Sequence, residues 1–161
     1  MFLGMFSNDQ LAKSAFVAYI HYLSIVLCFG SLLFERLKVK VDLNRVEAIS
    51  IVIADSVYGI AGLSLLVSGI LRVKYFGNGS DFYIDNPIFW VKVSLYIFIG
   101  VLSLYPTFRY LLWVLPLRKN KLPDLSKDLV DRLQLITTIE LIGFAVIPFF
   151  ASLMARGIGL N

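Results

Sequence analysis

Four long apolar segments constrain the fold of this chain more than any other feature of its sequence. Each approaches or exceeds the roughly 20 residues that a helix needs to span the hydrocarbon core of a bilayer. The segments cover about 12–34, 48–73, 87–114 and 129–155 of the 161 residues, and 58% of the chain is hydrophobic. An ordinary soluble domain is roughly 45–50% apolar, so a soluble core of this size cannot hide these side chains. The sequence therefore predicts a single integral membrane domain over residues 1–161.

The spanning segments are predicted to be helices. Strict alternation of polar and apolar residues is absent, which disfavours a transmembrane β-barrel. A helix satisfies its backbone polar groups within its own segment, as a lipid environment requires. Because the connections are short, we expect an all-α, four-helix bundle in up-down-up-down order, embedded in the lipid bilayer, with both termini on one side.

The distribution of basic residues predicts the orientation of this bundle. Ten of the 15 lysines and arginines fall at one side, in or next to the connections 35–47 and 115–128. The positive-inside rule places these two connections in the cytoplasm and both termini on the outer side. We expect a multi-pass protein of a bacterial plasma (inner) membrane, or of a thylakoid membrane in a cyanobacterium. Orientation thus accounts for the net charge of +4, and no nucleic-acid partner is expected.

Short motifs predict where helices begin and which face of the second segment is buried. Asn44 with Glu47 three residues later is typical of a capping box, and Asn86-Pro87 is typical of a helix start. Small residues along one helix face allow another helix to approach closely. The stripe Asp55, Gly59, Gly62, Leu66 and Gly69 therefore predicts the buried face of segment 48–73.

His21, the only histidine, lies near the middle of the first apolar segment. Cys28 and Glu35 follow at intervals of seven residues and share its helix face. An ionisable group at this depth requires a partner, a cavity or a ligand. Three interpretations stay open: a hydrogen bond that holds two helices together, a ligand for haem or a metal ion, and a group that handles protons.

Two carboxyl groups are predicted to lie inside the bilayer at similar depth. Asp55 and Glu140 both fall in the cytoplasmic halves of their segments, about 6–8 Å from the midplane at 1.5 Å per residue. Either one of them is protonated, or a cation lies between them. Arg109 is the candidate, because a guanidinium group pairs well with carboxylates. We therefore expect a buried polar network of Asp55, Arg109 and Glu140.

Three cations are expected at the opposite level of the bundle. Lys92 lies one turn inside the third segment, and Arg72 and Lys74 end the second. They form either an anion-binding rim or ordinary contacts with lipid phosphates. A lysine at this level can extend its ammonium group to the headgroups or bind a ligand carboxylate such as a haem propionate.

Several runs of sequence resemble a known family over nearly the whole chain. They are Phe16–Tyr22, Asp55–Gly59, Ser68–Val73, Tyr83–Lys92, Ser103–Thr107 and Pro148–Gly157. With these runs the chain resembles an uncharacterised family of four-helix bacterial membrane proteins. That resemblance implies a fold and no activity.

A more distant similarity points to a cofactor. The histidine of the first segment, the Trp-x-Lys motif ending at Lys92, and a glutamate with a proline in the fourth segment are similar to two groups. These are the membrane-embedded protoporphyrinogen oxidases, which are implied to bind haem b, and the four-helix copper-resistance membrane proteins. The similarity implies His21 as the haem- or metal-binding histidine, with Lys92 and Glu140 as matching residues.

Three functions from different classes follow from these observations. The first is haem or other tetrapyrrole binding through His21, with Lys92 and Arg72 at the propionates; as an enzyme, such a protein would be a membrane oxidoreductase similar to protoporphyrinogen oxidase. The second is a non-catalytic scaffold, an assembly factor or an accessory subunit of a larger membrane complex. The third is a proton or small-ion pathway through Asp55, His21 and Glu140, in a protein that forms homo-oligomers.

Overall fold

The structure, a computed structural model, describes residues 8–77 and 79–159. Its long helices are α1 (Asn8–Lys38), α2 (Arg45–Leu71), α4 (Pro87–Arg118) and α5 (Lys127–Ala155). A π-helical turn, η1 (Arg72–Phe76), continues α2, and the short helix α3 (Ser80–Ile84) precedes α4. Within these described residues there is no strand, and four helices are long and apolar enough to cross a membrane. The expected all-α bundle of four spanning helices is thus confirmed.

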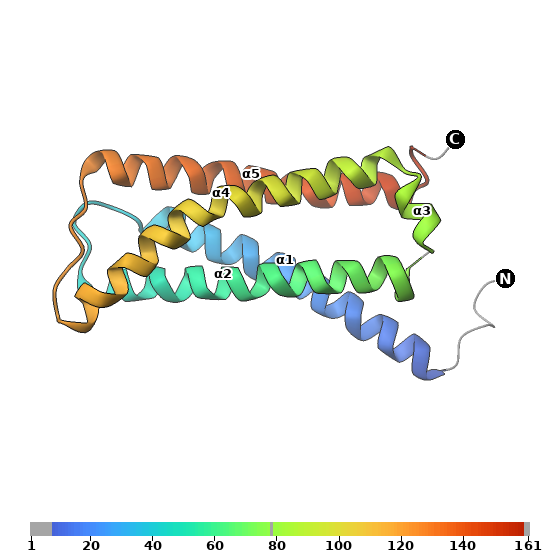
Figure 1. Ribbon diagram of the computed structural model, residues 1–161, viewed down its shortest axis with the longest axis horizontal. Helices are drawn as coiled ribbons and strands as arrows, with labels where there is room; N and C mark the ends of the chain where they lie inside the picture. Colours follow the sequence, from blue (N-terminus) through green and yellow to red (C-terminus); the bar gives the residue numbers. More distant parts are fainter. Residues whose placement is uncertain (1–7, 78, 160–161) are drawn as a thin grey trace.

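The four long helices alternate in direction along the bundle (Figure 1). The connections α1–α2 and α4–α5 lie at one end, here named the loop end. The start of α1, the segment from η1 to α3, and the end of α5 lie at the other, the terminal end. At the terminal end α1 leans away from the other helices, whereas α4 starts beside α5 and crosses towards α2 at the loop end (Figure 1).

The helices extend past the predicted spans at most of their ends. Helix α1 has 31 residues and α4 has 32, which gives each a length of about 46–48 Å at 1.5 Å per residue. This exceeds the hydrocarbon thickness of about 30 Å. The apolar segments therefore marked the parts of the helices that lipid surrounds, while polar residues continue each helix beyond them.

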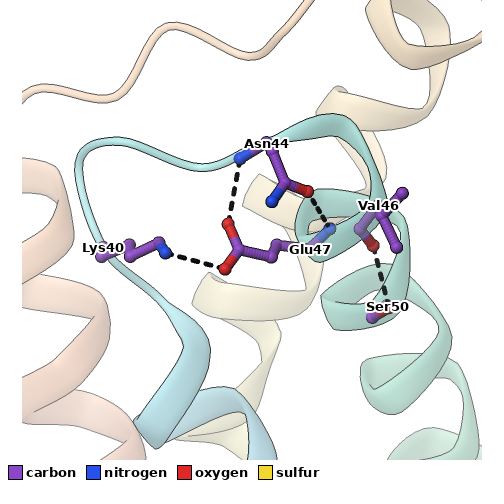
Figure 2. A network of polar contacts seen from close by, with 5 residues as sticks. All are labelled: Lys40, Asn44, Val46, Glu47 and Ser50. Carbon is purple, nitrogen blue, oxygen red and sulfur yellow. Dashed lines mark hydrogen bonds and ion pairs between the residues drawn. The ribbon is translucent and has the colours of Figure 1, made fainter.

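The predicted helix starts are confirmed by the local hydrogen bonds. Asn44 Oδ1 accepts a bond from the Glu47 backbone N–H at 2.9 Å, and Glu47 Oε2 accepts one from the Asn44 N–H at 3.0 Å. Lys40 Nζ also contacts Glu47 Oε1 at 2.7 Å, which ties the connection to the first turn of α2 (Figure 2). At the terminal end, the Asn86 side chain accepts a bond from the Ile88 N–H and so caps α4.

Buried apolar side chains form two clusters along the bundle. The cluster at the loop end includes the edge-to-face pair Tyr110 and Trp113, whose ring centroids are 4.8 Å apart. The cluster in the middle of the bundle includes Tyr58 of α2 and Phe144 of α5, with centroids 6.0 Å apart. These clusters hold the four helices together and fix the position of the polar residues between them.

The predicted buried face of α2 is wrong. Gly59 is exposed, and a Cβ atom placed on it meets nothing within 4 Å. The buried residues of α2 are Ala48, Ile51, Asp55, Tyr58, Ala61, Leu65 and Ser68. Asp55 is buried as predicted, but from Tyr58 onwards each buried residue precedes a residue of the predicted stripe by one position. The physical reason is that larger side chains fill the interface, whereas the glycines line its edge.

Two glycines at that edge do allow close approach. The Tyr96 hydroxyl donates to the Gly62 carbonyl at 2.7 Å. A Cβ atom on Gly69 would lie 3.4 Å from His21 Cε1. The small residues of α2 therefore accommodate one tyrosine of α4 and the imidazole of α1.

Candidate functional site

His21 is a half-buried residue of α1 that contacts Ser68, three residues before α2 ends at the terminal end of the bundle. Its Nδ1 lies 3.0 Å from the hydroxyl oxygen of Ser68. That hydroxyl is itself a donor, with carbonyl acceptors at 2.6 Å (Ser64) and 3.2 Å (Leu65). A hydroxyl group carries a single proton, so the Ser68 oxygen is left to accept a bond from His21 Nδ1–H.

This arrangement assigns the tautomer of the neutral imidazole. With the proton on Nδ1, the lone pair of Nε2 is available. Within residues 8–77 and 79–159 the side-chain partner of the ring is Ser68, at Nδ1, and the Leu65 backbone carbonyl is a further hydrogen-bond partner of the imidazole. A histidine that binds a metal typically donates its other ring N–H to a fixed acceptor, which orients the ring. Ser68 provides such an acceptor for His21.

Two cations accompany His21, and together these three residues are named the terminal cluster. Arg72 lies at the start of η1 and Lys92 in the second turn of α4. Both act electrostatically on the imidazole, and the Arg72 charge also acts on Lys92. The Arg72 guanidinium lies 5.2 Å from the centre of the Tyr22 ring, a separation that allows a cation–π interaction.

The cations of the terminal cluster have no acidic partner. The ion pairs among the described residues are Lys13–Asp9 and Lys40–Glu47, and neither involves Arg72 or Lys92. Both residues are half-buried, where an uncompensated charge is unfavourable. Lys74, the third cation expected here, is exposed to the surroundings of the bundle. The terminal cluster therefore carries positive charge that no acidic side chain of the described residues offsets.

The π-helical turn η1 distinguishes this end of α2. Arg72 is its first residue, and turns of this type occur frequently at functional sites. Within the described residues no group of three or more histidine, cysteine, aspartate or glutamate side chains is placed to hold a metal ion. A metal at His21 would therefore need ligands from outside this chain, such as the ring nitrogens of a porphyrin.

A second polar group, the carboxyl cluster, lies deeper and towards the loop end. It consists of Glu35 of α1, Asp55 of α2 and Glu140 of α5, whose charges act on one another. Their exposures are 1%, 7% and 0%. Thr107 of α4 donates to Asp55 Oδ1 at 2.7 Å. The structure thus places Asp55 and Glu140 in one cluster and adds Glu35 to it.

Arg109 does not form the predicted buried network with Asp55 and Glu140. It forms no ion pair in the described part of the chain, and its buried Nε has no hydrogen-bond partner. It lines two surface depressions at the loop end, together with Asp124 and Asp128. Equal depth was the reason for placing Arg109 beside the carboxyl groups, but depth does not determine which way a side chain points around the helix.

Sequence reasoning missed three residues that complete these groups. Glu35 was placed on the helix face of His21 but was not included in the predicted buried network of Asp55, Arg109 and Glu140. Ser68 and Tyr110 carried no signal, because a serine or a tyrosine in an apolar segment is common. Their role follows from the rotation of α2 and α4, which places Ser68 opposite His21 and Tyr110 against the carboxyl cluster.

These features define a multi-pass membrane protein whose bundle buries ionisable groups at two levels. The chain belongs to the family described as "Predicted membrane protein (DUF2214)", whose model matches residues 13–159. The resemblance to an uncharacterised family of membrane proteins is thus confirmed. No curated protein and no solved structure matches the chain. The more distant similarity to protoporphyrinogen oxidases and copper-resistance proteins has no support from these comparisons.

Proposed function

We propose that the terminal cluster binds haem or another anionic metallo-tetrapyrrole, with His21 as axial ligand. The observation that carries this proposal is the pairing of His21 Nδ1 with Ser68, because a proton on Nδ1 leaves the lone pair of Nε2 available to a metal. Imidazole nitrogen is the commonest axial ligand of haem iron. The unpaired cations Arg72 and Lys92 then match the two propionate groups that such a ligand carries.

The chain's own residues have distinct tasks in this proposal. Ser68 holds the imidazole ring in one orientation through the 3.0 Å contact. Gly69 keeps the space next to His21 Cε1 free, where a side chain would approach to 3.4 Å. Arg72 and Lys92 bind and orient the carboxylates of the ligand. When bound, haem would supply one-electron redox chemistry, which gives the protein a place in redox or tetrapyrrole metabolism.

The single histidine limits the number of axial imidazole ligands that one chain can supply to the iron. One chain offers one imidazole, so ligation by two histidines requires a second copy of the chain. A homo-oligomer with one haem for two chains is the corresponding assembly. We further propose that the basic loop end faces the cytoplasm, in a bacterial inner membrane or in the thylakoid membrane of a cyanobacterium, as the positive-inside rule requires.

The absorption spectrum of the detergent-purified protein tests this proposal. Protein from a haem-replete host is expected to show a Soret band, which His21→Ala abolishes. His21→Asn is the sharper variant, because its amide N–H can replace Nδ1–H at Ser68 while no ligand nitrogen replaces Nε2. Loss of the band in His21→Asn with unchanged thermal stability separates ligation from helix packing.

The cations provide a matched pair of variants. Lys92→Ala is expected to weaken haem binding, whereas Lys74→Ala, at the same level but exposed, is expected to leave it unchanged. Colourless protein that also fails to bind added haem overturns the proposal. If such protein instead purifies with a stoichiometric membrane partner, the scaffold function is favoured.

A further inference from the structure

The carboxyl cluster draws one acidic group from each of three helices and a donor from the fourth. Glu35, Asp55 and Glu140 come from α1, α2 and α5, and Thr107 of α4 binds Asp55. The cluster is built by the packing of the whole bundle, so it exists only when all four helices are assembled.

Three of the six carboxyl oxygens of this cluster are buried without a hydrogen-bond partner. Both carboxyl oxygens of Glu140 and Oε1 of Glu35 are fully buried without a hydrogen bond. No lysine or arginine of the described chain forms an ion pair with any of the three groups. An isolated ionised carboxylate in an apolar interior is highly unfavourable, and several close together are more so. A bound proton or cation must therefore neutralise the negative charge of these carboxyl groups.

Tyr110 independently indicates a ligand at the same place. Its side chain is 0% exposed, and its hydroxyl group forms no hydrogen bond of standard geometry, although Thr137 of α5 lies next to it. It interacts electrostatically with Glu35, Asp55 and Glu140 alike, so its hydroxyl is directed into the carboxyl cluster. A buried hydroxyl group without a partner is unfavourable, and a hydrogen bond to a carboxyl group or to a bound ligand removes that cost.

The compensating ligand is either a proton or a metal cation. The carboxyl groups of residues 8–77 and 79–159 are not placed as a set that could hold a metal ion. A proton needs no such set, because it binds one oxygen and is shared with the next by a hydrogen bond. We propose that Glu35, Asp55 and Glu140 form a proton-binding site that titrates as one coupled group.

The groups that face this site are few. They are Cys28 and Glu35 from α1, Asp55 and Tyr58 from α2, Thr107 and Tyr110 from α4, and Thr137 and Glu140 from α5. None of them is a cation, so ionisation of one carboxyl group disfavours ionisation of the others and the protons bind in coupled steps. Glu35 lies three residues before the end of α1 at the loop end. This site is separate from the terminal cluster and does not depend on haem.

Infrared spectroscopy of the full-length protein in nanodiscs tests the proposal. The carbonyl stretch of protonated carboxyl groups, identified by its shift in D₂O, is expected at neutral pH, where exposed carboxyl groups are ionised. Glu140→Gln keeps the shape of the side chain and is expected to lower the band by about one carboxyl group. Asp131→Asn is the matched control, because Asp131 lies exposed on the same helix and is expected to leave the band unchanged.

Two further variants keep the test decisive if Glu140→Gln does not fold. Glu35→Gln and Asp55→Asn are each expected to lower the same band. Absence of the band in the wild-type protein at neutral pH overturns the proposal, whatever the variants do. A thermal stability that then rises with added Na⁺ or K⁺ would identify a monovalent cation as the ligand instead.

Discussion

Thr107 Oγ1 lies 2.7 Å from Asp55 Oδ1 and joins α4 to α2 in the interior of the bundle. The bond is the one direct hydrogen bond that a carboxyl group of this cluster receives within the described residues. It fixes Asp55 towards the centre of the bundle, close to the carboxyl groups of Glu35 and Glu140.

Replacement of Thr107 by valine is expected to destabilise the protein by about 1–3 kcal/mol, because it leaves a buried acceptor of Asp55 without its donor. Valine keeps the shape of threonine, so packing is little changed. Ser56→Ala is the control: Ser56 is exposed and its hydroxyl bonds only to Val52 of its own helix, so the change in stability should stay within about 0.5 kcal/mol. Denaturation in mild detergent measures both, and equal effects would contradict the role of Thr107.

Replacement of Ser68 by alanine is expected to remove the acceptor that orients His21. The loss of this hydrogen bond should cost about 0.5–1.5 kcal/mol of stability. If haem binds as proposed, its affinity should fall about 10–100-fold, as for other groups that orient a metal-binding histidine. Ser64→Ala removes a hydroxyl that bonds to Ile60 on the same helix and should change neither property. Haem titration followed by absorbance checks this, and an unchanged affinity in Ser68→Ala would exclude the orienting role.

Two glycines form a matched pair for the packing of α4 on α5. A Cβ atom on Gly143 would lie 2.5 Å from Cδ1 and 2.9 Å from Cγ1 of the buried Ile99. Gly143→Ala is therefore expected to destabilise the bundle by about 1–3 kcal/mol through overpacking. A Cβ atom on Gly100 meets nothing within 4 Å, so Gly100→Ala should not destabilise it. Thermal unfolding of the two variants side by side gives the comparison.

The fold could be predicted from the sequence to a large extent, for physical reasons. Lipid accepts few kinds of spanning structure, so four apolar segments with short connections leave little choice of architecture. Asn44 and Asn86 could be identified as caps because capping depends on neighbouring residues alone. The rotation of α2 could not be predicted. One residue of displacement turns a helix by about 100°, and the glycine pattern does not indicate which larger side chains fill the interface.

The candidate sites could be predicted from the sequence only in part. Depth along a helix follows from counting residues, and on that basis Asp55 and Glu140 were expected at one level. The direction of a side chain depends on how the helices pack, which explains why Arg109 points to the loop-end surface while Tyr110, the next residue, points inwards. The η1 turn, which brings Arg72 towards His21, has no recognisable signal in the sequence.

The pH dependence of stability provides a prediction specific to the carboxyl cluster. If the folded protein holds protons on Glu35, Asp55 and Glu140 above neutral pH while the unfolded chain does not, the folded state binds more protons. Stability then falls as pH rises, by about 1.4 kcal/mol per pH unit for each proton lost on unfolding. Thermal unfolding of the wild-type protein should therefore shift to lower temperature between neutral and alkaline pH. Glu140→Gln removes one titrating group and should flatten this dependence, whereas Asp131→Asn should reproduce the wild-type slope. An unfolding temperature that stays constant or increases over this range would show that the carboxyl groups of the folded protein are already ionised at neutral pH.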